Sequence, residues 1–523
     1  MGSKGIRRDA DMSVTSFYFF CMFAVSLGVY YAIPRKFQWC ALVMFSAVFF
    51  VTSSDWRTGV YLLANIVVTF VVTTQIVKAK EKNKEESAKG YMLIGLAINL
   101  SMIATLKYSN FFVYNWNVLM NVMKTGHSLT ELQLFAPIGI SYYTFISVGY
   151  ILDVYWEITE AEKNPFKVGL FIGYYPQMTS GPISRFESVK EQLFTGHKFE
   201  YERVALGIQR MLWGVFKKLV ISTRAAILVD AIYADPVAYT GLYVWVAAFL
   251  FILQLYTDFS GCMDIILGAS ECYGIRLPEN FRTPFFSRNV QEFWQRWHIT
   301  LGVWFKDYVL YPVLRTSTLR NFTKWLKKHV GKKVSKQLPS YLGMLCVWIL
   351  IGLWHGGAWK YILGEGMWFW LCIVLGQVLA PAFKKITTVL QIDTECFGYH
   401  LFQSLRVFFF VAIGNMFFRL DGMSAAIAEI KSGFSEFNPW IFFDGSFVNM
   451  GLSYRDQNIL VFGVFLLFIV AILQEKYGEA REWMKKQFLP FRWFVWVFLY
   501  LFVLINGAYG PGYSAAEFIY RGF

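Results

Sequence analysis

The chain has 523 residues, of which 56% are hydrophobic, 19% are aromatic and only 16% are charged. Soluble domains carry about 25% charged residues, so this composition excludes an ordinary soluble protein. Apolar stretches long enough to cross a bilayer recur from end to end, which predicts one polytopic α-helical membrane domain over residues 1–523. The net charge of +14 does not indicate nucleic-acid binding, because the basic residues cluster in short loops between apolar stretches.

We expect about eleven or more membrane spans. The first is expected to be retained, because no small-residue cleavage pattern follows it. The spans are predicted near residues 14–33, 37–53, 57–77, 91–107, 134–156, 239–257, 340–357, 361–382, 401–420, 458–473 and 491–509.

Charged loops predict the orientation of these spans. The charged stretch 78–89 follows three spans and is expected in the cytoplasm, which places the N-terminus outside, although Lys4, Arg7 and Arg8 argue against that placement. Basic residues between 476 and 492 mark a cytoplasmic loop before the last span. The sequence therefore predicts a multi-pass protein of the cell membrane with both termini extracytoplasmic.

Two regions depart from the pattern of simple spans. Residues 166–230 contain an apolar segment interrupted by Pro176, Gly181 and Pro182, followed by a basic helix, and we interpret them as re-entrant or interfacial helices. The basic loop expected at 315–336 has two interpretations. It sets topology and contacts anionic lipid, or it attracts an acidic carrier protein or the phosphates of coenzyme A.

The first candidate for chemistry is His298. Apolar residues recur at helical spacing from 290 to 308, which predicts one helix whose buried stripe carries His298 among the indoles of Trp294 and Trp297. The seven cysteines show no CxxC spacing, so neither a zinc site nor a disulfide framework is expected.

The second candidate is His355, which ends the apolar run 342–354 and is followed by Gly356 and Gly357. These glycines allow a bend or the close approach of another segment. An ionisable group in a membrane segment is a functional hypothesis, because its burial is costly. The alternative for both histidines is a neutral core imidazole bonded to a backbone carbonyl.

Several linked motifs carry a family resemblance. They resemble the membrane-bound O-acyltransferase (MBOAT) superfamily, in its bacterial polysaccharide (alginate-type) O-acetyltransferase branch, which is related to the teichoic-acid D-alanyl transfer membrane protein. The motifs are Pro137–Phe145, Tyr175–Arg185, Leu212–Lys218, Tyr256–Gly261, Asn280–Phe285, Glu292–Leu301, Trp304–Tyr308 and Gly352–Gly356.

The resemblance implies an MBOAT fold around a central tunnel, with a catalytic core at about 134–382. It matches His355 to the essential histidine of the superfamily and His298 to its second polar position. One departure concerns Glu365, which stands where the branch often shows a second His-Gly pair. This carboxylate either lines the cavity or forms a structural pair.

Acyl transfer from a thioester to a hydroxyl needs a base and a group that steadies the developing oxyanion. We expect His355 to be the base and His298, or the Trp297 indole, to polarise the thioester carbonyl. The donor is expected to be acetyl-CoA or an acyl-carrier thioester, with no permanently bound cofactor or metal. The other residues expected to line the tunnel or orient the base are Trp354, Asp258, Asp307 and Glu365.

The chain ends in an F-x-Y-x-x-F sequence within the tail 510–523. This ending resembles that of the small membrane peptide of the teichoic-acid D-alanylation system, where a tyrosine is thought to accept the acyl group. By resemblance, Tyr520 is a candidate acyl relay to an extracytoplasmic SGNH-type transferase. The alternative is an aromatic belt at the membrane interface.

These features favour acetyl transfer across the membrane for O-acetylation of an extracytoplasmic cell-envelope polysaccharide. D-alanyl transfer to teichoic acid, or acylation of a lipid or protein, stays open as a second interpretation. The expected partners are the lipid bilayer, the SGNH-type transferase and an acyl carrier protein. A transporter is disfavoured, because the chain shows no pair of corresponding halves.

Overall fold

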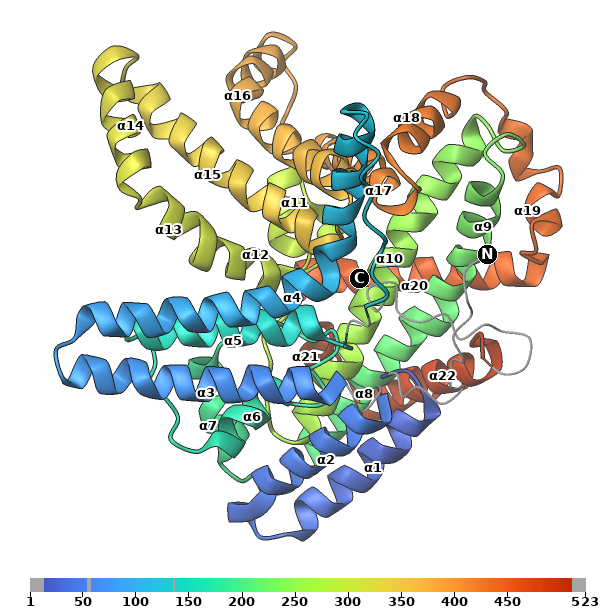
Figure 1. Ribbon diagram of the computed structural model, residues 1–523. Helices are drawn as coiled ribbons and strands as arrows, with labels where there is room; N and C mark the ends of the chain where they lie inside the picture. Colours follow the sequence, from blue (N-terminus) through green and yellow to red (C-terminus); the bar gives the residue numbers. More distant parts are fainter. Residues whose placement is uncertain (1–13, 54–57, 135–136, 510–523) are drawn as a thin grey trace. The chain divides into compact units, whose positions relative to one another are not determined.

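The computed structural model describes residues 14–53, 58–134 and 137–509. Within these ranges the regular structure is helical, apart from one isolated antiparallel bridge between Phe281 and Trp297 (Figure 1). The described chain forms two compact units. Unit 1 contains residues up to 215 and 262–278, and unit 2 contains 216–261 and the residues from 279 onwards.

The predicted polytopic helical class is confirmed. Among the described residues, nine helical stretches are long and apolar enough to cross a membrane. Two other predicted spans correspond to the 16-residue helices α1 (Phe17–Ala32) and α5 (Ile140–Tyr155). The nine stretches contain α2 (Gln38–Ser53), α3 (Gly59–Glu81), α4 (Glu85–Val122), α10 (Leu242–Cys272), α15 (Lys332–His355), α16 (Met367–Val389), α17 (Phe397–Arg419), α20 (Tyr454–Tyr477) and α22 (Leu489–Asn506).

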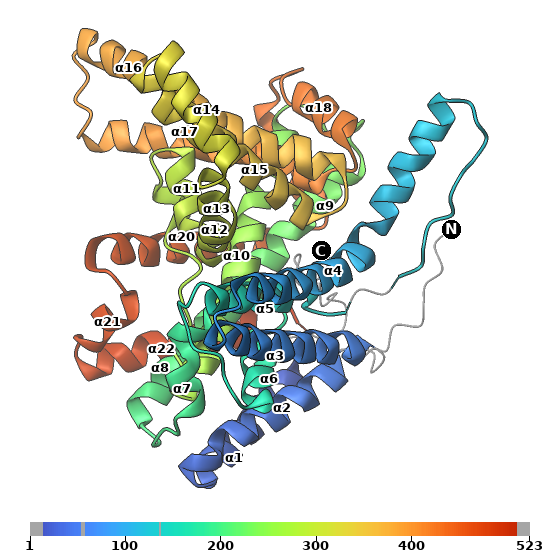
Figure 2. The same ribbon diagram turned by 60° about the vertical axis from the view of Figure 1, so that its left-hand side comes forward.

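In unit 1, helices α3, α4 and α5 pack side by side, and buried polar side chains join them (Figures 1 and 2). Asn65 Nδ2 donates to Asn99 Oδ1 at 2.6 Å, and Ser147 Oγ donates to Asn65 Oδ1 at 2.5 Å. Every residue of α5 from Ile140 to Val154 is buried. Since buried amides without partners are costly, this closed set of hydrogen bonds specifies how the three helices pack.

Helix α4 is much longer than a bilayer crossing requires, with 38 residues. In both views its second half turns away from its first half (Figures 1 and 2). Two asparagines on the second half hold the following segment. Asn110 exchanges hydrogen bonds of 2.8 and 2.9 Å with the backbone of Leu132, and Asn117 exchanges bonds of 2.7 and 2.9 Å with that of Leu129.

The middle region is helical. Its prolines and its glycine lie between two short helices, and residues 201–234 form one continuous helical stretch. The helices of this region are α6 (Pro165–Gly173), α7 (Phe186–Phe194), α8 (Tyr201–Phe216), the π-helical stretch η3 (Lys217–Ser222) and α9 (Thr223–Ala234). Their re-entrant or interfacial placement in the membrane stays a prediction.

The prediction of a loop at 315–336 is wrong, because most of these residues are helical. Helix α14 (Ser317–His329) occupies its centre, and α15 begins at Lys332. The Thr316 hydroxyl caps α14 by accepting a hydrogen bond from the Leu319 N–H. Basic residues in the last turn of α14 complement the helix dipole, and Leu326 buries its apolar side. The basic charges therefore stand on a helix.

Candidate active site

His298 does not lie inside a continuous helix, and the predicted helix over 290–308 is corrected here. Helix α11 (Val290–Arg296) ends before Trp297, and α12 (Ile299–Phe305) begins after His298. His298 itself has left-handed backbone angles, with φ 48° and ψ 51°. A non-glycine residue in this region is uncommon and requires support from its surroundings.

A neighbouring segment supplies that support through its backbone. The N–H of Ile299 donates to the carbonyl of Asn280 at 3.0 Å, and the N–H of Arg282 donates to the carbonyl of Arg296 at 2.9 Å. The bridge between Phe281 and Trp297 lies in the same stretch. Backbone groups at the helix break are therefore hydrogen-bonded to residues 280–282 instead of to the next helical turn.

The side chain of Asn280 also contributes, and sequence reasoning did not assign it a role. Its Oδ1 atom accepts hydrogen bonds from the N–H and the hydroxyl of Thr300, at 3.0 and 2.9 Å. The same Oδ1 lies 3.2 Å from Nδ1 of His298. Asn280 is fully buried. One amide oxygen thus connects the start of α12 to the imidazole.

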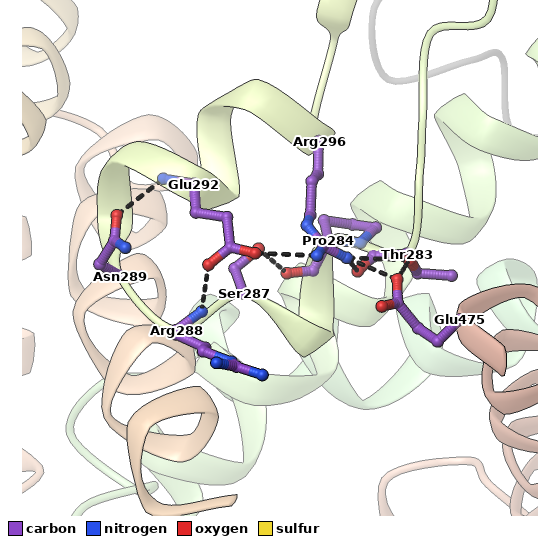
Figure 3. Close-up of polar contacts among 8 residues, drawn as sticks. All are labelled: Thr283, Pro284, Ser287, Arg288, Asn289, Glu292, Arg296 and Glu475. Carbon is purple, nitrogen blue, oxygen red and sulfur yellow. Dashed lines mark hydrogen bonds and ion pairs between the residues drawn. The ribbon is translucent and has the colours of Figure 1, made fainter. Parts of the chain in front are cut away.

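An ion-pair network around Arg296, the last residue of α11, connects this helix to neighbouring segments (Figure 3). Arg296 pairs with Glu292 at 2.8 Å and with Glu475 of α20 at 2.5 Å. The Thr283 hydroxyl donates to Glu475 and accepts from Arg296 at 3.2 Å. Asn289 caps α11 by accepting from the Glu292 N–H at 2.9 Å. These contacts tie the segment that follows Asn280 to both α11 and α20.

His355 is the last residue of α15, and two glycines near it permit close packing. A Cβ atom on Gly352 would lie 2.4 Å from the carbonyl oxygen of Tyr361, and one on Gly356 would lie 2.5 Å from the Tyr361 ring. Gly352 was not part of the prediction, whereas at Gly356 the expected close approach of another segment is confirmed. That segment is the π-helical stretch η6 (Lys360–Gly366).

The segment η6 carries Glu365 to the histidine. Nε2 of His355 lies 3.5 Å from Oε1 of Glu365, and both side chains are buried. Of the two interpretations of Glu365, the structure supports a paired carboxylate, and its partner is the candidate base. A carboxylate beside an imidazole holds the ring in orientation and stabilises its protonated form.

The indole of Trp354 contacts the imidazole rings of both histidines. The ring centroid of Trp354 is 5.8 Å from that of His298 and 4.9 Å from that of His355. Phe259 packs edge-on against His298 at 4.8 Å, and Phe418 packs against His355 at 5.4 Å. The structure therefore brings His298, Trp354, His355 and Glu365 into one aromatic-walled cluster within unit 2.

The other predicted site residues have different surroundings. Trp297 is buried against Tyr256 and Phe293. Asp258 forms an ion pair with Lys218, so it has a structural partner.

Asp307 is half-buried in the π-helical stretch η5 (Lys306–Leu310). Tyr520 and the tail 510–523 lie outside the described residues. Within the described chain, no group of three or more His, Cys, Asp or Glu side chains has the arrangement of a metal site.

The electrostatics of the cluster favour an uncharged imidazole at 298. His298 lies outside the candidate membrane spans, and burial holds its pKa well below the ordinary value of 6.5. Desolvation disfavours the charged ring, and among the described residues no carboxylate lies within ion-pair distance of it. His298 is therefore a neutral group at physiological pH.

These features define a polytopic helical membrane protein with two buried histidines, one of which faces a carboxylate. A model of the MBOAT, membrane-bound O-acyltransferase family, matches residues 163–323. A probable alginate O-acetylase of Pseudomonas aeruginosa is 30% identical over 427 residues, which cover 81% of this chain and 74% of that protein. The chain belongs to the MBOAT family and is a membrane O-acyltransferase.

Two further relatives carry other names. A peptidoglycan O-acetyltransferase of Helicobacter pylori is 26% identical over 367 residues, covering 65% of this chain and 64% of that protein. A teichoic acid D-alanyltransferase of Bacillus subtilis is 29% identical over 289 residues, covering 52% of this chain and 69% of that protein. The similarity therefore extends to proteins named for different acyl groups and different envelope polymers.

Proposed function

We propose that the protein transfers acetyl groups from a cytoplasmic thioester donor for O-acetylation of an extracytoplasmic cell-envelope polysaccharide. The greater coverage of the alginate and peptidoglycan O-acetylating relatives supports acetyl as the acyl group. The donor would be acetyl-CoA or an acyl-carrier thioester. D-alanyl transfer to teichoic acid is the second candidate, and the teichoic acid relatives favour it.

The observation that carries the mechanism is the buried pair of His355 and Glu365, with 3.5 Å between Nε2 and Oε1. In this proposal His355 removes the proton from the attacking hydroxyl as that oxygen bonds to the thioester carbonyl carbon. Glu365 stabilises the imidazolium that forms. The carbon–sulfur bond then breaks, the carbonyl re-forms, and the proton passes to the departing thiolate.

The donor is tested with protein reconstituted in liposomes. Radiolabelled acetyl-CoA and, separately, a carrier protein charged with labelled D-alanine are supplied, and the label transferred to a hydroxyl acceptor is counted. We expect transfer from acetyl-CoA, and we expect His355→Ala to reduce it by about 10²- to 10⁴-fold, the usual contribution of a general base. Transfer from the D-alanyl carrier alone would reject the acetyl assignment.

The proposal also assigns Tyr520 as a relay that accepts acetyl and passes it to an extracytoplasmic SGNH-type transferase. This part rests on the resemblance of the chain's ending and on the predicted extracytoplasmic C-terminus. Tyr520→Phe is expected to abolish polysaccharide acetylation in cells. Tyr500→Phe, which changes an exposed tyrosine on α22, is the matched control and is expected to have no effect. Undiminished acetylation in Tyr520→Phe would eliminate the relay.

A further inference from the structure

We propose that Asn280 is a positioning residue that fixes His298 as the tautomer protonated on Nδ1, so that Nε2 accepts a hydrogen bond from a substrate group other than the hydroxyl that His355 deprotonates. The inference rests on the proposed function for the identity of that substrate. It concerns a residue to which neither the motifs nor the family resemblance assigned a role.

The assignment begins with the backbone of Thr300. A backbone N–H can only donate, so the Asn280 atom that lies 3.0 Å from it must be the amide oxygen. The Thr300 hydroxyl lies 2.9 Å from the same atom. The backbone contact orients the amide independently of the imidazole, because a hydroxyl can donate or accept whereas an N–H can only donate. It settles the choice between the oxygen and the nitrogen of the amide.

The orientation of the amide then determines the imidazole. An amide oxygen has no hydrogen to donate, so the 3.2 Å contact with His298 requires the hydrogen to be on Nδ1. A neutral imidazole has one N–H, and burial keeps this ring neutral by lowering its pKa. Nε2 therefore carries an unprotonated lone pair.

Nε2 is buried and has no hydrogen-bond partner among the described residues. The rings of Phe259 and Trp354 contact the imidazole. Two titratable groups belong to the same cluster: His355, whose ring contacts the same indole, and Glu365, which pairs with His355. A buried acceptor left without a donor is unfavourable, so the site suits a ligand that brings an O–H group.

This tautomer changes the role expected for His298. A thioester carbonyl oxygen accepts hydrogen bonds and cannot donate one, so it has no favourable contact with an unprotonated Nε2. A hydroxyl does donate. His298 therefore binds a hydrogen-bond donor of a substrate and does not polarise the thioester carbonyl.

Nitrogen NMR tests the tautomer directly, without substrate. Protein labelled with ¹⁵N-histidine is reconstituted in lipid, and His298→Gln identifies the signals of His298 by their loss. We expect a hydrogen on Nδ1 and none on Nε2 at neutral pH. A hydrogen on Nε2 would overturn the proposal, whereas a failed choice of donor or polymer would leave this spectrum unchanged.

Variants at 280 test the consequence for activity. Asn280→Ala removes the acceptor and is expected to lower kcat by about 10- to 100-fold, the usual effect of losing a group that orients a functional histidine. Thr300→Val is the matched control. It removes one hydrogen bond to Asn280 but keeps the backbone N–H that orients the amide, so kcat should stay near the wild-type value.

Asn280→Asp separates positioning from a structural role. A carboxylate keeps an acceptor beside Nδ1, and its charge raises the pKa of His298 by favouring the protonated ring. Activity should then be near wild-type at alkaline pH and fall as the pH drops through the raised pKa. A folded Asn280→Asp protein that is inactive at every pH, or an Asn280→Ala protein with wild-type kcat, would overturn the proposal.

Discussion

A carboxylate contacts one buried histidine and an amide oxygen contacts the other, and these partners give the two rings different properties. Glu365 is a negative partner when ionised, so it favours a protonated His355. Asn280 is neutral and accepts hydrogen bonds, so it favours a neutral His298 with a defined tautomer. The two imidazoles around Trp354 are therefore not interchangeable, and each depends on a partner from another segment.

Glu365→Gln tests the dependence of His355 on its carboxylate. The amide keeps the shape of the side chain but removes the charge that stabilises the imidazolium, so kcat should fall by about 10- to 100-fold while KM changes little. Acetyl transfer by purified protein in liposomes measures both constants.

The control for this change is Glu429→Gln in α18 (Met423–Ser432), another buried carboxylate of unit 2. The acetyl-transfer rate of Glu429→Gln should equal that of the wild-type protein. An equal loss in both variants would mean that any change to a buried glutamate disturbs the fold, and it would remove Glu365 from the mechanism.

The site was predictable from sequence in part. Both histidines could be found because burying an ionisable imidazole in an apolar segment costs free energy, so such a residue indicates a functional site. Glu365 drew attention for the same reason, although its partner could not be named. Asn280 was missed because its link to His298 crosses 18 positions of the chain and runs through a local pairing that periodicity does not reveal.

At the scale of elements, a π-helical stretch presents Glu365 to the end of α15. The backbone of this stretch, η6, approaches α15 at Gly352. A Cβ atom at this position would lie 2.4 Å from the carbonyl oxygen of Tyr361 and 2.8 Å from the Cα of Ile362. Backbone atoms cannot move aside as the end of a flexible side chain can. The distance between His355 and Glu365 therefore depends on the absence of a side chain at 352.

Gly352→Ala is expected to displace η6 and to lower both the melting temperature and the acetylation rate. Gly376→Ala in α16 is the matched control, because no atom lies within 4 Å of the added methyl group. Alanine is favoured over glycine in a helix by about 1 kcal/mol, so this control should be neutral or slightly stabilising. Thermal unfolding in detergent compares the two variants, and equal melting temperatures would contradict the close contact.

The spans and the helix break differ in how far sequence could predict them. Every predicted span corresponds to a helix in the structure. Such spans are easy to predict because the thickness of the bilayer requires about 20 consecutive apolar residues. The break at His298 was hidden, since α11 and α12 each keep helical spacing. The residues that stabilise it, 280–282, act through backbone bonds and through the Asn280 side chain, and helical spacing reveals neither. The helix α14 was mistaken for a loop because charge dominated its composition.

At the scale of the whole molecule, the orientation in the membrane stays a prediction, and α4 offers a test of it. Lys84 precedes the helix and Val122 ends it, and both side chains are exposed. In a background without the native cysteines, Lys84→Cys should react with an impermeant maleimide only after the cells are opened. Val122→Cys should react in intact cells whose outer envelope admits the reagent. Labelling with the opposite pattern would reverse the predicted orientation.

The length of α4 has a mechanical consequence. At about 1.5 Å per residue, its 38 residues extend for about 57 Å along the helix, whereas the lipid interior is about 30 Å thick. The second half turns aside instead of continuing straight (Figure 2). The rings of Phe112 and Tyr114 in this half are exposed. Tyrosine is enriched in the headgroup layer, so we expect this half to lie along the surface of one leaflet. Thinning or thickening the bilayer would then act on α4, and we expect unit 1 to respond to that change.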